Sequence, residues 1–216
     1  MYDMARGATM TKLTQGRIAA AALALLERDG LDRFSMRRVA AELDVGAMTL
    51  YGYFRSKDEL LDAAVDLASA EIALPPSGGT WQEQLRSLVT EMLRVLRAYP
   101  VAHHIRARGP MLSSGALRST EAGLSILVGA GCSQEDASKA WRLLFTYVFG
   151  FAAFTPAELS DAERRELKLR LAGMDATELP HVAAAAAAGA EAMTGSDAFG
   201  FGLEAILAGL EARTSI

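Results

Sequence analysis

The sequence predicts an all-α protein, with a small N-terminal head of three helices and a larger helical body. Apolar residues recur at helical spacing along nearly the whole chain, and Ser or Thr residues followed three positions later by Glu or Asp stand at helix starts. No segment shows the strict apolar–polar alternation that predicts a strand. With 216 residues, 51% of them hydrophobic, the chain can form a sizeable core.

The first predicted helix begins after Thr14 and ends at Gly30. A threonine hydroxyl can accept a hydrogen bond from an N–H group at a helix start, and glycine tolerates the left-handed conformation that follows a helix end. Residues 1 to about 11 form a polar arm ahead of this helix. Five apolar residues give the helix its inward face: Ile18, Ala21, Ala22, Leu25 and Leu26.

Residues 35–57 predict two short helices that are joined by a tight turn at 43–46. Ser35 caps the first helix, whose apolar stripe consists of Val39, Ala40 and Leu43. The second helix has an inward face made by Leu50 and Phe54, four residues apart.

The next helix starts directly after this pair, at a predicted capping box formed by Ser56 and Glu59. In a helix-turn-helix of this size, the second helix enters the major groove of DNA. Residues 35–57 therefore predict a DNA-binding protein.

The distribution of charge supports this prediction, although the net charge is −4. Residues 1–57 contain nine Lys or Arg and six Asp or Glu, a balance of +3, whereas residues 58–216 contain thirteen against twenty, a balance of −7. A basic head on an acidic body is expected when only one end meets phosphate, and DNA binding should then weaken as salt rises.

Other classes of protein find little support. There is no run of 18 apolar residues and no signal segment, so we expect a cytoplasmic protein. A single cysteine, Cys132, excludes an internal disulfide and a cysteine-rich metal site, and it is expected to be a small residue near a helix end. His103 and His104 are adjacent and face different sides of a helix, so they cannot chelate one metal ion. We expect no metal and no cofactor, and an enzyme is a remote alternative.

The body is predicted to start with the helix 58–72, which connects it to the head at 1–57. Residues 75–79 (Pro-Pro-Ser-Gly-Gly) predict a loop that separates this helix from the next. Thr80 and Glu83 then form a capping box for a helix that stops at Pro100. Further helices are predicted at 101–107, 115–130, 134–154 (capped by Ser133 with Asp136), from a cap at 155–158 to about 171, and near 197–212, with an alanine tract at 183–188.

The N-terminal residues resemble the TetR family of bacterial transcription regulators. The resemblance covers about residues 11–62, and its motifs are Phe34-Ser35-Met36-Arg37-Arg38-Val39-Ala40, Thr49-Leu50-Tyr51-Gly52-Tyr53-Phe54 and Lys57-Asp58-Glu59-Leu60-Leu61. The body resembles the family more loosely, through Trp81, Tyr99-Pro100, Trp141, Tyr147-Val148-Phe149-Gly150 and Phe201-Gly202-Leu203-Glu204.

The resemblance implies a homodimeric repressor that binds a palindromic operator and is released by a small, largely apolar effector. It implies these DNA-contacting residues: Ser35, Arg37, Ala47, Met48, Thr49, Tyr51, Tyr53 and Lys57. Gly46 and Met48 depart from the family pattern, which often has Ser or Thr and Pro there, so the second helix is expected to start less firmly capped. Ala47 and Met48 have no hydrogen-bonding side chain, so Arg37 becomes the main candidate for reading guanine. Tyr51 and Tyr53 could instead be core aromatics, and one of the two is expected to be partly so. Arg38 is expected to be solvated or bound to the backbone, and Arg6, Lys12 and Arg17 could touch phosphate or solvent.

The body supplies the side chains for an apolar effector pocket with a few polar groups. The predicted lining residues are Met92, Leu96, His103, His104, Met111, Leu124, Leu127, Trp141 and Phe145; the alternative for each apolar one is plain core. Helices 134–154 and 197–212 are predicted to form a four-helix dimer interface, with burial inside one chain as the alternative. The apolar residues that the last helix would contribute are Phe199, Leu203, Ile206, Leu207 and Leu210. A dimeric DNA-binding protein without a ligand is the other function that remains open.

Overall fold

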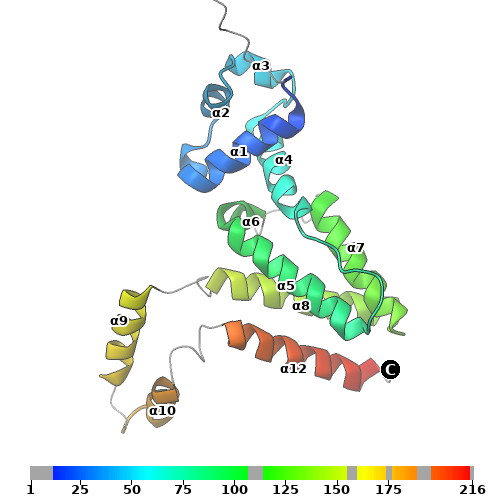
Figure 1. Cartoon of the computed structure of the whole chain (residues 1–216), viewed down its shortest axis with the longest axis vertical. Helices are drawn as coiled ribbons and strands as arrows, with labels where there is room; N and C mark the ends of the chain where they lie inside the picture. The colour runs from blue at the N-terminus through cyan, green and yellow to red at the C-terminus, as the bar shows by residue number, and fades with distance from the viewer. Residues whose placement is uncertain (1–11, 107–113, 155–159, 174–176, 189–195, 215–216) are drawn as a thin grey trace, which may run out of the picture. The chain divides into compact units, whose positions relative to one another are not determined.

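The computed structural model describes residues 12–106, 114–154, 160–173, 177–188 and 196–214 (Figure 1). Every regular element in these ranges is helical, which confirms the predicted all-α fold. The elements are α1 (Gln15–Asp29), the short 3₁₀ turn η1 (Leu31–Arg33), α2 (Met36–Glu42), α3 (Ala47–Tyr51), α4 (Lys57–Ala70), α5 (Trp81–Ala98), α6 (Pro100–Arg106), α7 (Ser114–Gly129), α8 (Gln134–Phe154), α9 (Asp161–Ala172), α10 (Pro180–Ala188) and α12 (Ser196–Thr214).

The predicted N-caps of the first helices are present. The hydroxyl groups of Thr14, Ser35 and Ser56 accept hydrogen bonds from backbone N–H groups at the starts of α1, α2 and α4. The capping box predicted at Ser56 is only half formed, because the carboxylate of Glu59 accepts from the N–H of Arg55 instead. Gly30 ends α1 with φ 77°, in the left-handed region that glycine tolerates.

In the body, Thr80 and Glu83 form the complete predicted capping box, and the N–H of Thr80 holds the pKa of Glu83 below its ordinary value. The prediction for α9 was wrong in detail. Its cap is Ser160, which exchanges hydrogen bonds with Glu163, and the predicted cap at 155–158 lies outside the described residues. The alanine tract belongs to α10.

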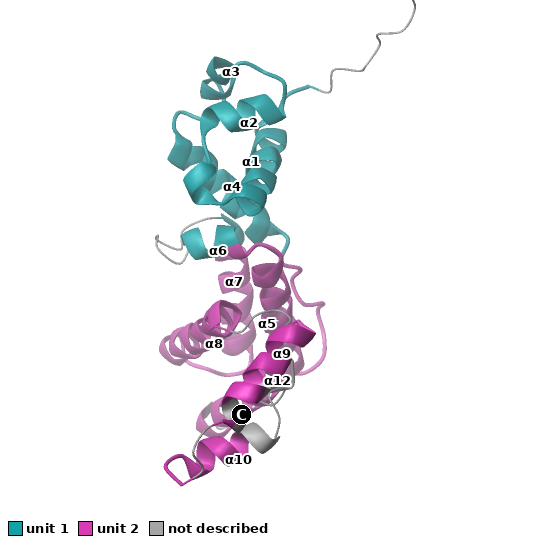
Figure 2. Cartoon of the chain, turned by 90° about the vertical axis from the view of Figure 1, so that its left-hand side faces the viewer, with its two compact units in different colours: residues 1–71, 101–115 teal, residues 72–100, 116–216 magenta. Residues whose placement is uncertain are grey.

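The chain folds into two compact units (Figure 2). Unit 1 comprises residues 1–71 and 101–115, and unit 2 comprises residues 72–100 and 116–216. Unit 1 therefore extends beyond the predicted head at 1–57, because α4 packs against α1 and buries its apolar face, which consists of Leu60, Leu61, Ala64, Val65 and Ala68. The segment 101–115 joins this unit from far along the sequence.

The core of unit 2 is built from α5, α7, α8 and α12. Helices α7 and α8 approach closely at Gly123, where a Cβ atom would overlap the indole ring of Trp141. Helices α8 and α12 approach in the same way at Gly202, beside the phenol of Tyr147. The Tyr147 hydroxyl donates a 2.8 Å hydrogen bond to the carbonyl of Phe199, and burial raises its pKa. Glycine thus sets the spacing of the helices in this core.

None of the helices in the described part of the chain is both long enough and apolar enough to cross a membrane.

Candidate DNA-binding and ligand-binding sites

The turn between α2 and α3 is held by backbone hydrogen bonds. Asp44 occupies the left-handed region at φ 53°, and the N–H of Val45 returns to the carbonyl of Ala40 at 3.0 Å. Asp is among the residue types that adopt this conformation most readily. Helix α3 spans five residues, and its N-cap residue Gly46 provides no side-chain cap, as the missing Ser or Thr predicted. Leu50 anchors α3 because its side chain is fully buried.

The opposite face of this motif is open to solvent. Met48 is 80% exposed and Tyr51 is 46% exposed, while Leu50 and Phe54 point inward. Among the predicted DNA contacts, the structure exposes Arg37, Met48, Thr49, Tyr51 and Lys57 and leaves Ser35, Ala47 and Tyr53 half-buried. Five of the predicted residues are thus free to meet a partner.

Two of the predicted DNA-contacting residues form hydrogen bonds within the chain. The hydroxyl of Ser35 accepts from the N–H of Arg38 at 3.3 Å. The hydroxyl of Tyr53 donates to the carbonyl of Leu13 at 3.1 Å, and so fixes the start of the chain's described part to the motif. The hypothesis that one of the two tyrosines is partly structural fits Tyr53. Whether either tyrosine touches DNA stays a prediction.

Several charges of unit 1 neutralise one another. Arg28 forms ion pairs with Asp29 and Glu42, and its hydrogen bonds hold the pKa of each carboxyl below its ordinary value. Arg38 pairs with Asp29 and also donates to the carbonyl of Arg33. Arg38 is therefore held by the protein, as predicted, and Arg37 beside it is exposed.

Two carboxylates connect the segment 101–115 to α1 and α4. Glu27 of α1 accepts from the N–H groups of Val101 at 3.2 Å and Ala102 at 2.7 Å. Asp66 of α4 accepts from the N–H of Gly115 at 2.7 Å and from the Ser114 hydroxyl. Each carboxylate satisfies N–H groups that a helix leaves open at its start. Sequence reasoning missed both residues, because the partners lie 48 or more positions away.

The predicted effector residues fall into three groups. Met92, Leu96, Leu127 and Trp141 lie in the buried core of unit 2, with Leu124 and Phe145 packed against that core. His103 is buried and His104 exposed, and both belong to unit 1. Met111 lies outside the described residues.

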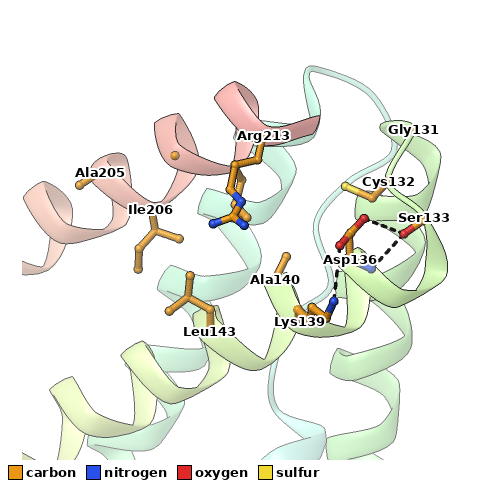
Figure 3. Close-up of a pocket in the computed structure, with 12 residues that line it drawn as sticks. Gly131, Cys132, Ser133, Asp136, Lys139, Ala140, Leu143, Ala205, Ile206 and Arg213 are labelled. Atoms are coloured by element: carbon orange, nitrogen blue, oxygen red, sulfur yellow. Dashed lines mark hydrogen bonds and ion pairs between the residues drawn. The ribbon is translucent and has the colours of Figure 1, made fainter. Parts of the chain in front are cut away.

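A cleft of about 640 Å³ lies between α8 and α12 (Figure 3). In Figure 3, Leu143 and Ile206 point toward each other across it, and Cys132 lies near the start of α8. Cys132 is buried, and burial raises the pKa of its thiol. Ser133 caps α8 together with Asp136, with hydrogen bonds of 2.8 and 3.1 Å.

Of the apolar residues predicted for the dimer interface on the last helix, Phe199, Leu203 and Leu207 are buried within this chain. Burial inside one chain, the alternative, therefore accounts for these three of the five residues. Ile206 and Leu210 are half-buried and line the cleft. The large apolar side chains that remain exposed on α8 and α12 are Leu143, Phe154 and Phe201.

Comparison with known proteins identifies the fold and the motif. Residues 18–64 match the family described as bacterial regulatory proteins, tetR family. Residues 74–214, more than half of the chain, match the tetracyclin repressor-like C-terminal domain. The chain belongs to the TetR family. TetR-family proteins are transcriptional regulators that bind DNA and small molecules, so this chain is a DNA-binding regulator and not an enzyme.

Relatives within the TetR family include repressors. The HTH-type transcriptional repressor DrrR1 of Streptomyces coeruleorubidus is 32% identical over 92% of this chain and 77% of that protein. An HTH-type transcriptional regulator of Saccharopolyspora erythraea is 35% identical, over 66% of this chain and only 61% of that protein. The chain thus spans less than two thirds of that second relative.

The solved structures include ActR from Streptomyces coelicolor. Its apo form has a TM-score of 0.79 and 31% identity, covering 96% of this chain and 99% of ActR. Its complex with actinorhodin has a TM-score of 0.78 and 29% identity, covering 95% of this chain and 100% of ActR.

Among the described residues of this TetR-family chain, no three His, Cys, Asp or Glu side chains form a group that could hold a metal ion.

Proposed function

We propose that this regulator is a repressor that binds a palindromic operator as a homodimer and leaves it when a small, largely apolar effector binds. One observation carries the proposal: the α2–α3 motif presents Arg37, Met48 and Tyr51 to solvent above a fully buried core. A rigid motif with an exposed outer face is what insertion into the major groove requires.

The exposed side chains divide into two chemical groups. Arg37 has the bidentate donors that match the major-groove edge of guanine, and Met48 can make apolar contact with thymine methyl groups. Lys57 lies at the start of α4, where its charge adds to the positive end of the helix dipole and favours phosphate. We expect Arg37 to read sequence and Lys57 to fix position.

Replacing Arg37 by Ala should weaken binding to the operator by about 1–3 kcal/mol and relax specificity at one base pair. Replacing Lys57 by Ala should weaken binding to all sequences alike and reduce the salt slope by about one. Fluorescence-anisotropy titrations on an operator and on a scrambled duplex, at several salt concentrations, measure both effects. If R37A weakened binding to the two duplexes equally, Arg37 would be a phosphate contact and not a base reader.

The exposed apolar face of α8 and α12 supports the proposed dimer. Leu143, Phe154 and Phe201 are 49%, 89% and 81% exposed, which is unusual for three large apolar side chains on two neighbouring helices. The small residues Ala205 and Gly209 beside the cleft would allow a second copy of α8 and α12 to approach closely. A two-fold symmetric pairing would bury the same patch on both copies.

The core of unit 2 is the proposed place of the effector. Its residues include the predicted Met92, Leu96 and Trp141, and the existence of a complex of ActR with actinorhodin supports a ligand-binding role for this chain. An effector acts only if it binds one conformation of the regulator better than another, and typical coupling is about 1–3 kcal/mol per site. Concentration-dependent thermal stabilisation by actinorhodin or another candidate, together with a weaker operator affinity, would support this role. Stabilisation without a change in operator affinity would favour the ligand-independent alternative.

Glu27 and Asp66 hold residues 101–102 and 114–115 to α1 and α4 by hydrogen bonds within unit 1. Replacing Glu27 by Gln removes the charge that faces the N–H groups of Val101 and Ala102. We expect these two amides to exchange hydrogen about tenfold faster, because a charged acceptor is worth about 1.5–3 kcal/mol. Asp62→Asn, at an exposed carboxylate of α4, is the matched control. Equal exchange rates in E27Q and wild type would show that Glu27 does not hold α6.

A further inference from the structure

A second groove lies between α5 and α12, within unit 2, and encloses about 500 Å³. This volume is in the range of small-molecule sites. The groove is lined by one face of α5, from Arg86 to Arg97, and by the first turns of α12, from Phe199 to Glu204. None of the residues predicted for the effector pocket lines it.

The floor of the groove is apolar and closely packed. Leu93, Phe199 and Leu203 are 5%, 6% and 2% exposed. The ring of Phe199 stacks on Tyr147 at 5.3 Å between centroids and meets Phe151 edge-on at 5.1 Å. An aromatic ligand would find a preformed aromatic and aliphatic surface here.

The walls of the groove carry three arginines, and two of them are neutralised by carboxylates. Arg86 makes a bidentate pair with Glu204, with distances of 2.7 and 2.8 Å. Arg94 pairs with Glu91 at 2.6 Å. Each of these carboxyl groups has a pKa below its ordinary value because of the arginine beside it.

The third arginine, Arg97, is different. In the described part of the chain no carboxylate pairs with it, and its Nε atom is buried without a hydrogen-bond acceptor. Its guanidinium lies 5.7 Å from the ring centroid of Phe151, so the aromatic group holds it in place. Arg97 is therefore a positioned cation beside an apolar floor, and no carboxylate among the described residues neutralises its charge.

Gly200 keeps the middle of the groove open. A Cβ atom added at Gly200 would meet no other heavy atom within 4 Å, whereas one added at Gly202, on the packed side of α12, would overlap Tyr147. A large side chain at Gly200 would therefore project into the groove without disturbing the helix packing. This gives a way to block the groove that leaves its charges intact.

We propose that this groove binds a small aromatic anion, with Arg97 as the anchor for a carboxylate, sulfonate or phenolate and with Leu93, Phe199 and Leu203 beneath the rings. Arginine suits this task because its planar donors match an anion and its face stacks on aromatic rings. The site is separate from the proposed effector residues. It concerns binding alone, and so it does not depend on the proposed repression.

Two fluorescent probes of the same ring system test the site on the full chain. Anilinonaphthalene sulfonate carries the anion, and N-phenylnaphthylamine lacks it. We expect Arg97→Met to weaken binding of the sulfonate about tenfold while the affinity for the neutral probe stays nearly unchanged. Arg97→Lys, which keeps the charge, should restore most of the affinity. Arg170→Met, at an exposed arginine of α9, is the control and should bind both probes as wild type does.

Gly200→Trp tests the location independently of charge. It should weaken binding of both probes about tenfold or more, with an unchanged circular dichroism spectrum and melting temperature. The proposal is overturned if wild type does not bind the sulfonate, if Arg97→Met binds it as tightly as wild type, or if Gly200→Trp leaves both affinities unchanged. The last result would place the probes elsewhere on the protein, for example on the exposed face of α8 and α12.

Discussion

Replacing both Leu143 and Phe201 by Glu is expected to convert the regulator into a monomer and to weaken operator binding by about a hundredfold or more. The two side chains are 49% and 81% exposed in the single chain, so glutamate costs little there. In the proposed dimer they would be buried, and four unpaired carboxylates would then face one another. A dimer binds the operator with two linked heads, which raises the affinity by about 10²–10⁴ over a single head, and a monomer loses this increase.

Light scattering coupled to size-exclusion chromatography measures the mass, and anisotropy measures the affinity. The matched control is Leu169→Glu, a similar change at a 75% exposed leucine of α9. A double variant that remained a dimer and bound operator normally would show that another surface joins the two copies.

Replacing Gly123 by Ala is expected to destabilise unit 2 by about 1–3 kcal/mol or more, because the added methyl group overlaps the buried ring of Trp141. The sign of the change in unfolding free energy is informative, since Gly→Ala at a helix position with free space around it normally stabilises the protein by about 0.5–1 kcal/mol. Denaturant unfolding followed by circular dichroism measures the change.

Gly150→Ala in α8 provides the comparison, because its added methyl group would meet nothing within 4 Å. It should be neutral or stabilising. A second substitution, Trp141→Leu, should recover part of the loss in Gly123→Ala, so that the two changes together cost less than their sum. Full additivity, or a stabilising Gly123→Ala, would contradict the close packing of α7 on α8.

Local signals in the sequence predicted much of this fold. Thr14, Ser35, Thr80 and Ser133 each mark a helix start within one residue, because a capping hydroxyl acts on N–H groups only two or three positions ahead. The helix 134–154 was predicted with its observed bounds, Gln134–Phe154. The exposed face of α3 was predicted from Leu50, because an apolar residue that points inward fixes which side of a helix faces solvent.

Long-range partners could not be predicted in this way. Glu27 and Asp66 resemble ordinary surface carboxylates until the fold brings 101–115 to them. Tyr53 was ambiguous because its hydroxyl partner, the Leu13 carbonyl, lies forty residues away. Likewise, Arg97 lacks a carboxylate partner among the described residues because the neighbouring Arg86 and Arg94 pair with Glu204 and Glu91. The pairing of Arg86 with Glu204 depends on how α5 packs against α12, which the sequence alone does not show.

In vitro selection of duplex DNA from a random pool, by the purified chain at fixed salt, tests the central claim most directly. The proposed dimer predicts an enriched inverted repeat whose half-sites are about 34–36 Å apart, or a multiple of that spacing, and Arg37→Ala should lose the preference at one position of each half-site. Enrichment of a single unrepeated half-site, or of no sequence at all, would contradict the account.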